Sequence, residues 1–144
     1  MLFKRLPDGN SGASAIEFAF LAPILAFMAL GMIDVWSLAS TSLAMHAAVQ
    51  AGAKYLVQGG AGTSKVEDII NAAWVSPPSG HNVTVTQACT CSGTAADCAS
   101  YCVTNFPPMM VYTLAASGSW SAPANVQFLN LSQTVTDTQV VRVR

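Results

Sequence analysis

The stretch Gly12-Ala13-Ser14-Ala15-Ile16-Glu17-Phe18 runs directly into an apolar segment that continues from Ala19 to Ile33. A single carboxylate, Glu17, therefore stands at the beginning of a segment with the composition of a membrane-spanning helix. An isolated charge that enters hydrocarbon loses several kcal/mol of hydration free energy. Glu17 is therefore predicted to lie at a membrane interface or to pair with a positive group.

The composition of the whole chain agrees with an anchored, exported protein. Of its 144 residues, 52% are apolar and only 9% are charged, which is too apolar for an ordinary soluble domain. The net charge is −1 and the six basic residues are scattered, so the clustered Lys and Arg of a nucleic-acid-binding face are missing. The four cysteines favour an oxidising compartment.

The apolar segment is long enough to cross most of a bilayer. Between Glu17 and Asp34 lie 16 uncharged residues, which at about 1.5 Å per residue span roughly 24 Å of a ~30 Å hydrocarbon core. Continuation through Val35, Trp36 and Leu38 completes the span, and an indole is favoured at the interface. We therefore predict a leader at 1–12, a transmembrane segment at 13–38 and an extracytoplasmic domain at 39–144.

The charges on either side of this segment predict its orientation in the membrane, whereas its processing is left open. Lys4 and Arg5 precede it and the next positive charge is Lys54, so the N-terminus is predicted to be cytoplasmic. Three alternatives remain open: a signal peptide cleaved near Ala39-Ser40, an uncleaved signal anchor, and a leader cleaved after Gly12.

Helical sequence continues beyond the membrane. From Ser37 to Gln58 there is no proline and much alanine, so one helix of some 45 residues is expected, ended by Gly59-Gly60-Ala61-Gly62. Small residues form two strips, at Ala44, Ala48 and Gly52 and at Ala47 and Ala51. Such strips let another backbone approach, either a neighbouring helix or the chain's own sheet.

A short helix and a small sheet are predicted to follow. Ser64 is the expected N-cap of the helix, with Glu67 as its capping-box partner, and the apolar stripe consists of Val66, Ile69, Ile70 and Ala73. Strands are expected at 82–87, with Val83 and Val85 inward, at 109–119 and at 133–143. The predicted fold class is α+β, with a small antiparallel β-sheet packed on the outer half of the long helix.

The spacing of the cysteines favours structural disulfides over zinc binding or redox catalysis. The spacings Cys89-x-Cys91 and Cys98-x3-Cys102 fit zinc knuckles and redox motifs poorly. In hairpin geometry, nested pairing of Cys89 with Cys102 and of Cys91 with Cys98 is predicted. No metal site is expected.

Catalysis is not expected either. His46 lies in the helix and His81 in a turn, with no acidic residue at a suggestive spacing, so both are interpreted as surface or packing residues. No nucleophile elbow, P-loop or dinucleotide fingerprint occurs. The prediction is a protein that is not an enzyme and needs no cofactor.

The first stretch resembles the signals of type IV pilins, in which a prepilin peptidase cleaves after glycine. Cleavage between Gly12 and Ala13 would make Glu17 the fifth residue of the mature chain. The chain also resembles the TadE-like pseudopilins of tight-adherence pilus systems, through the segments Leu21-Ala-Pro23, Gly31-Met-Ile-Asp34, Ala47-Ala48-Val-Gln-Ala-Gly52-Ala-Lys54-Tyr55 and Val83-Thr-Val-Thr86. Ser37 and Val49 stand where the family commonly has arginines.

This resemblance implies a pilin-like component of a pilus assembly system that acts by helix–helix association. The implied partners are other pilins and pseudopilins, a prepilin peptidase, the inner-membrane assembly platform and membrane lipid. The implied location is the bacterial inner membrane, crossed once, with the C-terminal domain periplasmic and entry into a surface pilus left open. The alternative is an uncleaved, membrane-tethered periplasmic binding or sensory module.

Overall fold

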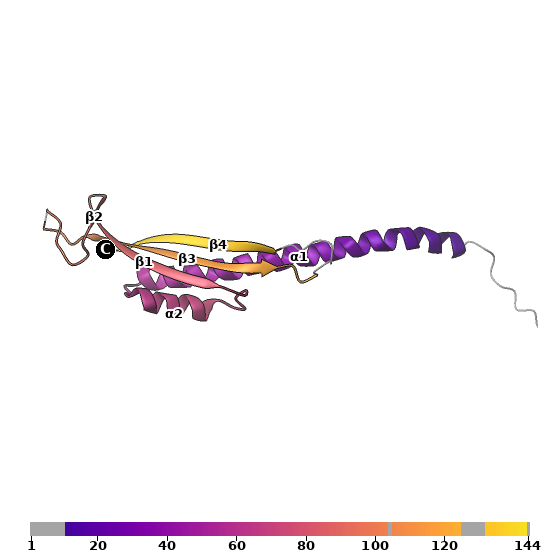
Figure 1. Ribbon diagram of the computed structural model, residues 1–144, viewed down its shortest axis with the longest axis horizontal. Helices are drawn as coiled ribbons and strands as arrows, with labels where there is room; N and C mark the ends of the chain where they lie inside the picture. The colour runs from indigo at the N-terminus through magenta and orange to yellow at the C-terminus, as the bar shows by residue number, and fades with distance from the viewer. Residues whose placement is uncertain (1–10, 104, 125–131, 144) are drawn as a thin grey trace, which may run out of the picture.

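The computed structural model describes the backbone of residues 11–103, 105–124 and 132–143, and the side chains of these ranges from residue 15 onward. A long helix, α1 (Ser11–Val57), extends as a stalk from a body formed by its outer half and the other elements (Figure 1). These are α2 (Thr63–Ala73), β1 (Asn82–Cys91), β2 (Thr94–Ala96), β3 (Met109–Ser121) and β4 (Ser132–Val143). At about 1.5 Å per residue, the 47 residues of α1 extend roughly 70 Å.

The predicted single long helix and its glycine terminator are confirmed. Helix α1 runs without interruption through Pro23 and ends at Val57. Beyond it the Gly60 N–H donates to the carbonyl of Tyr55 and the Gly59 N–H to that of Leu56. This is the Schellman arrangement, and Gly59 has the positive φ of 91° that it requires.

Helix α2 forms where it was expected, but the predicted capping box is wrong. The N-cap is Gly62, Ser64 lies inside the helix, and no side chain caps its N-terminus. The partner proposed for Ser64 is engaged elsewhere, because a carboxylate oxygen of Glu67 accepts a hydrogen bond from the Val85 N–H at 3.0 Å. The tertiary contact with β1 therefore replaces the local cap.

The sheet is antiparallel throughout, in the order β2-β1-β3-β4. All three predicted strands are present, and the first continues beyond its predicted end to Cys91. Strand β2 was missed. It follows a two-residue turn at Ser92 and Gly93, both with positive φ as a type I′ hairpin turn requires. The Ser-Gly dipeptide is the sequence signal that could have revealed it.

The core lies between the sheet and the two helices, which cover one face of it (Figure 1). Its buried side chains come from every layer: Met45, Ala48, Val49, Leu56, Val66, Ile70, Trp74, Val85, Tyr112, Leu114, Ala116, Trp120, Ala122 and Val135. The expected α+β architecture, with the sheet packed on the outer half of the long helix, is thus confirmed.

The two strips of small residues face different ways. Ala48 and Gly52 are buried and Ala44 is half-buried, whereas Ala47 is exposed. At Gly52 the helices α1 and α2 are closest, because a Cβ placed there would lie 2.6 Å from Cγ1 of Ile70 and 3.1 Å from Cγ1 of Val66. The first strip therefore packs inside the body, whereas the second, in which Ala47 is exposed and Ala51 half-buried, lies partly on its surface.

We expect Gly52→Leu to destabilise the body, because its side chain must displace Ile70 and force α2 away from α1. Overpacking of this kind costs about 1–3 kcal/mol, despite the better helix propensity of leucine. Gly31→Leu is the matched control, since a Cβ at Gly31 meets nothing within 4 Å. Thermal unfolding of the full chain in detergent should show a lower Tm for Gly52→Leu alone. Equal melting of the two variants would contradict the packing.

Candidate functional site

The predicted processing site and Glu17 lie at the N-terminal end of α1. The backbone of Gly12 and Ala13 is helical, and Glu17 follows Ala13 by four residues, about one helical turn. The Glu17 side chain is exposed. Among the described residues, the one contact within ion-pair distance joins the His46 ring to the Asp137 carboxylate, so Glu17 has no ionic partner within that part of the chain.

The α1 segment that follows Glu17 is covered by nothing else in the described chain. From residue 15 to residue 33 every side chain is exposed except Ala22, and Phe20 exposes 74% of its surface. These 19 residues extend about 28 Å, close to the ~30 Å thickness of a bilayer core. In length and composition, α1 can cross a membrane once.

Two hydrogen bonds mark the place where the body begins. The Ala124 N–H donates to a carboxylate oxygen of Asp34 at 3.1 Å, and the indole N–H of Trp120 donates to the Ser37 hydroxyl at 3.2 Å. One end of the sheet is thereby fixed to α1 where its apolar segment ends. Ser37 thus has a structural role within this chain.

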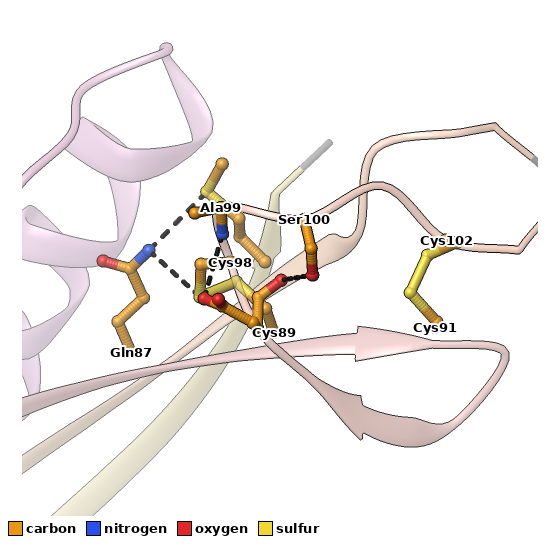
Figure 2. Close-up of a disulfide and its surroundings, with 9 residues drawn as sticks. Gln87, Cys89, Cys91, Cys98, Ala99, Ser100 and Cys102 are labelled. Carbon is orange, nitrogen blue, oxygen red and sulfur yellow. Dashed lines mark hydrogen bonds between the residues drawn. A yellow bond between two sulfur atoms is a disulfide. The ribbon is translucent and has the colours of Figure 1, made fainter.

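The cysteines form two disulfides at the opposite end of the molecule, beyond the end of α1 (Figures 1 and 2). Cys89 pairs with Cys98, with 5.1 Å between their Cα atoms, and Cys91 pairs with Cys102, with 5.7 Å between theirs. Structural disulfides are confirmed, but the predicted nested pairing of Cys89 with Cys102 and of Cys91 with Cys98 is wrong.

The turn at Ser92 and Gly93 explains the error. It closes the hairpin so tightly that Cys89 lies opposite Ala96, two residues before Cys98. The chain then turns, with the Ser100 N–H donating to the Asp97 carbonyl and the Ala99 N–H to its carboxylate. Figure 2 shows the result: Cys98 meets Cys89 beside Gln87, and Cys102 returns to Cys91 near the hairpin turn.

His46 has an acidic partner that sequence spacing could not reveal. Its Nδ1 lies 2.9 Å from a carboxylate oxygen of Asp137, 91 positions away, and its Nε2 lies 2.9 Å from the Gln50 amide nitrogen. The imidazole thus connects α1 to β4. His81 has the predicted packing role, since its ring meets the edge of Trp74 with centroids 5.6 Å apart.

We expect single cysteine variants to confirm the pairing. Cys98→Ser should free the thiol of Cys89, and Cys102→Ser should free that of Cys91. Because each disulfide closes a short loop, each substitution should also lower stability by about 2–3 kcal/mol. Alkylation followed by fragmentation of the labelled peptide identifies the free thiol. Nested pairing would give the opposite labels, Cys91 in the first variant and Cys89 in the second.

Comparison with known proteins finds one family match, and it lies within α1. Residues 12–54 match a family model described as TadE-like protein. No curated protein matches the chain, and no solved structure matches it either. The matched range begins at Gly12, includes the uncovered segment of α1 and continues into the part that packs against α2. The resemblance found in the sequence is thereby confirmed for residues 12–54, which are similar to the TadE-like family.

Proposed function

We propose that this protein is a minor pseudopilin of a tight-adherence pilus assembly system, anchored in the bacterial inner membrane and acting by helix association rather than catalysis. The observation that carries the proposal is the uncovered apolar half of α1, which lies within the TadE-like range and has the length of a bilayer core. A segment with so much exposed apolar surface needs lipid or other apolar helices around it.

The proposed topology has the N-terminus in the cytoplasm and the body in the periplasm. Lys4 and Arg5 favour the cytoplasmic side, and the two disulfides suit an oxidising compartment. The hydrogen bonds of Asp34 and Ser37 to the end of the sheet would then lie near the periplasmic face of the inner membrane, with the body directly above the lipid.

In this proposal a prepilin peptidase removes the leader after Gly12, and Glu17 acts in assembly. The new α-amino group on Ala13 is cationic at neutral pH. Glu17, one turn further along, neutralises this amine or the amine of an adjacent pilin or pseudopilin. An unpaired charge of either sign is costly in low dielectric, so the pairing would fix the axial register between neighbouring helices.

Pairing between subunits requires the negative charge of Glu17. We expect Glu17→Gln to be inserted, cleaved after Gly12 and folded, but to lose crosslinking to partner pilins and to reduce piliation at least tenfold. Asp68→Asn is the matched control, because it neutralises an exposed carboxylate on α2. N-terminal mass spectrometry and pilus counts are the measurements. Normal piliation by Glu17→Gln at wild-type protein levels would contradict the role of this charge.

The topology is tested separately. A phosphatase that is active only in the periplasm, fused after Arg144, should be active in cells that produce the full chain. The same enzyme fused before Met1 is the control and should be inactive. An inactive C-terminal fusion at normal abundance would contradict the orientation. An intact leader in the active fusion would favour a tethered module that is not processed.

A further inference from the structure

The two edges of the sheet are treated differently by the fold. At one edge, β1 is followed by β2, which is only three residues long and is bounded by the disulfide-linked loop. At the other edge lies β4, which is 12 residues long and pairs only with β3 within the described chain. An unpaired strand exposes a row of backbone donors and acceptors that can pair with another chain.

The β1 edge is closed beyond β2 as well. The Val85 N–H, which points away from β3, donates to the carboxylate of Glu67 on α2. A side chain that occupies the middle of an exposed edge prevents another strand from pairing there, which is a common protection of sheet edges. The fold thus blocks the edge next to α2.

The β4 edge has no such protection in the described chain. Its ladder with β3 keeps a constant register from Ser132 to Val143, without a bulge. The strand contains neither proline nor lysine, and the Asp137 carboxylate turns toward His46 on the helix side. Arg142 is the single positive charge along the strand and lies near its end.

The register shows which backbone groups are free. Since the Val85 N–H points away from β3, the neighbouring Thr84 must bond with β3, opposite Ala115. The next residue of β3, Ala116, then faces β4, opposite Asp137. Even-numbered residues of β4 therefore direct their N–H and C=O groups outward: Thr134, Thr136, Thr138, Val140 and Arg142.

A groove runs beside this edge on the helix side. It has a volume of about 470 Å³ and lies between α1 and the first half of β4. Its lining includes Ser42, Met45, His46 and Leu43, which exposes 68% of its surface. A strand added to β4 would place alternate side chains over this groove, and the others on the outer face of the sheet.

We propose that the outer edge of β4 is a docking site for an extended segment of a different exported polypeptide, which adds a fifth strand to the sheet. Alternating free donors and acceptors along one line are matched by the backbone of an extended chain. The side chains that face the groove would be small or apolar over Leu43, with a polar group beside His46. This inference rests on the membrane anchor and topology of the proposed function, but not on a role in pilus assembly.

The geometry argues against a second copy of β4 as the occupant. The strands run along α1 (Figure 1), so antiparallel pairing of β4 with β4 would point the two uncovered α1 segments in opposite directions. Two copies anchored from the same side of one membrane cannot adopt that arrangement. In-register parallel pairing would place Asp137 next to Asp137 and Arg142 next to Arg142, and like charges at such positions are destabilising.

The inference predicts photocrosslinks from both faces of the edge to one segment. The probe is benzoylphenylalanine, introduced into the full chain in native membranes at Leu43 on the helix side or at Thr136 on the outer face. Both positions should crosslink to the same partner, at sites within about three residues of each other, because the two probes would contact opposite faces of the same added strand. The same probe at Thr84, on the outer face of β1, should not reach that segment.

A pair of substitutions separates backbone pairing from side-chain contact. Thr138→Pro removes an outward N–H but none of the bonds to β3, and proline is tolerated on that side of an edge strand. It should lower the crosslink yield from Leu43 about tenfold, whereas Thr138→Ala keeps the N–H and should leave the yield within about twofold. If Thr138→Pro fails to fold, Thr136→Pro, read from Leu43, makes the same test.

Hydrogen exchange provides a readout that needs no variant. In the isolated full chain in detergent, the amides of Thr136, Thr138 and Val140 should exchange quickly, and those of Asp137 and Gln139 slowly. Fast exchange at all five amides, or protection of the three outward amides, would overturn the open edge. Equal crosslinking by the proline and alanine variants would overturn backbone pairing with the partner. Absence of crosslinks in native membranes, or crosslinks only to β4 of a second copy, would overturn the proposed occupant.

Discussion

The close approach of α1 and α2 at Gly52 is the contact on which the body depends. Gly52 places no side chain between the helices, so Ile70 and Val66 of α2 pack directly on the backbone of α1, and a Cβ on Gly52 would overlap Ile70. Because α2 sits so close, Glu67 reaches the edge of β1, and the sheet then covers Met45, Val49 and Leu56 of α1. A residue that is poor for helix propensity is thus used where packing between helices outweighs it.

The same helix serves two surroundings, and the transition between them is sharp. From Phe18 to Ile33 the side chains of α1 are apolar and, except for Ala22, exposed, as lipid favours; from Asp34 onward polar groups of the helix bond with the end of the sheet. A continuous helix satisfies its own backbone hydrogen bonds in both environments, which an irregular connection could not do in hydrocarbon. The body is therefore held at a fixed height and rotation relative to the anchor.

At the far end, the disulfides fix a loop that has little core of its own. The segment after β2 places Tyr101 and Phe106 on the surface, and its shape depends on the bonds of Cys98 and Cys102 to β1. Short covalent loops suit a region where too little apolar surface is buried to hold the chain. The molecule is thus organised by exposed apolar surface at one end, a packed core in the middle and disulfides at the other end.

The sequence by itself determined the long helix, its glycine terminator, the second helix, three strands and the similarity of residues 12–54 to the TadE-like family, because each depends on local periodicity, turn residues or a contiguous motif. Three features were decided only by the tertiary structure: the loss of the predicted cap at Ser64, the disulfide partners of Cys89 and Cys91, and the partner of His46. The Glu67 carboxylate could accept a hydrogen bond from the backbone N–H of Ser64 or from that of Val85. Packing of α2 against β1 favoured the bond with Val85. One tight turn at Ser92 and Gly93 shifted the cysteine pairing, and His46 meets Asp137 only because β4 lies beside α1. Contacts between residues so far apart in the chain depend on how elements pack in three dimensions, and spacing along the sequence contains no information about that packing.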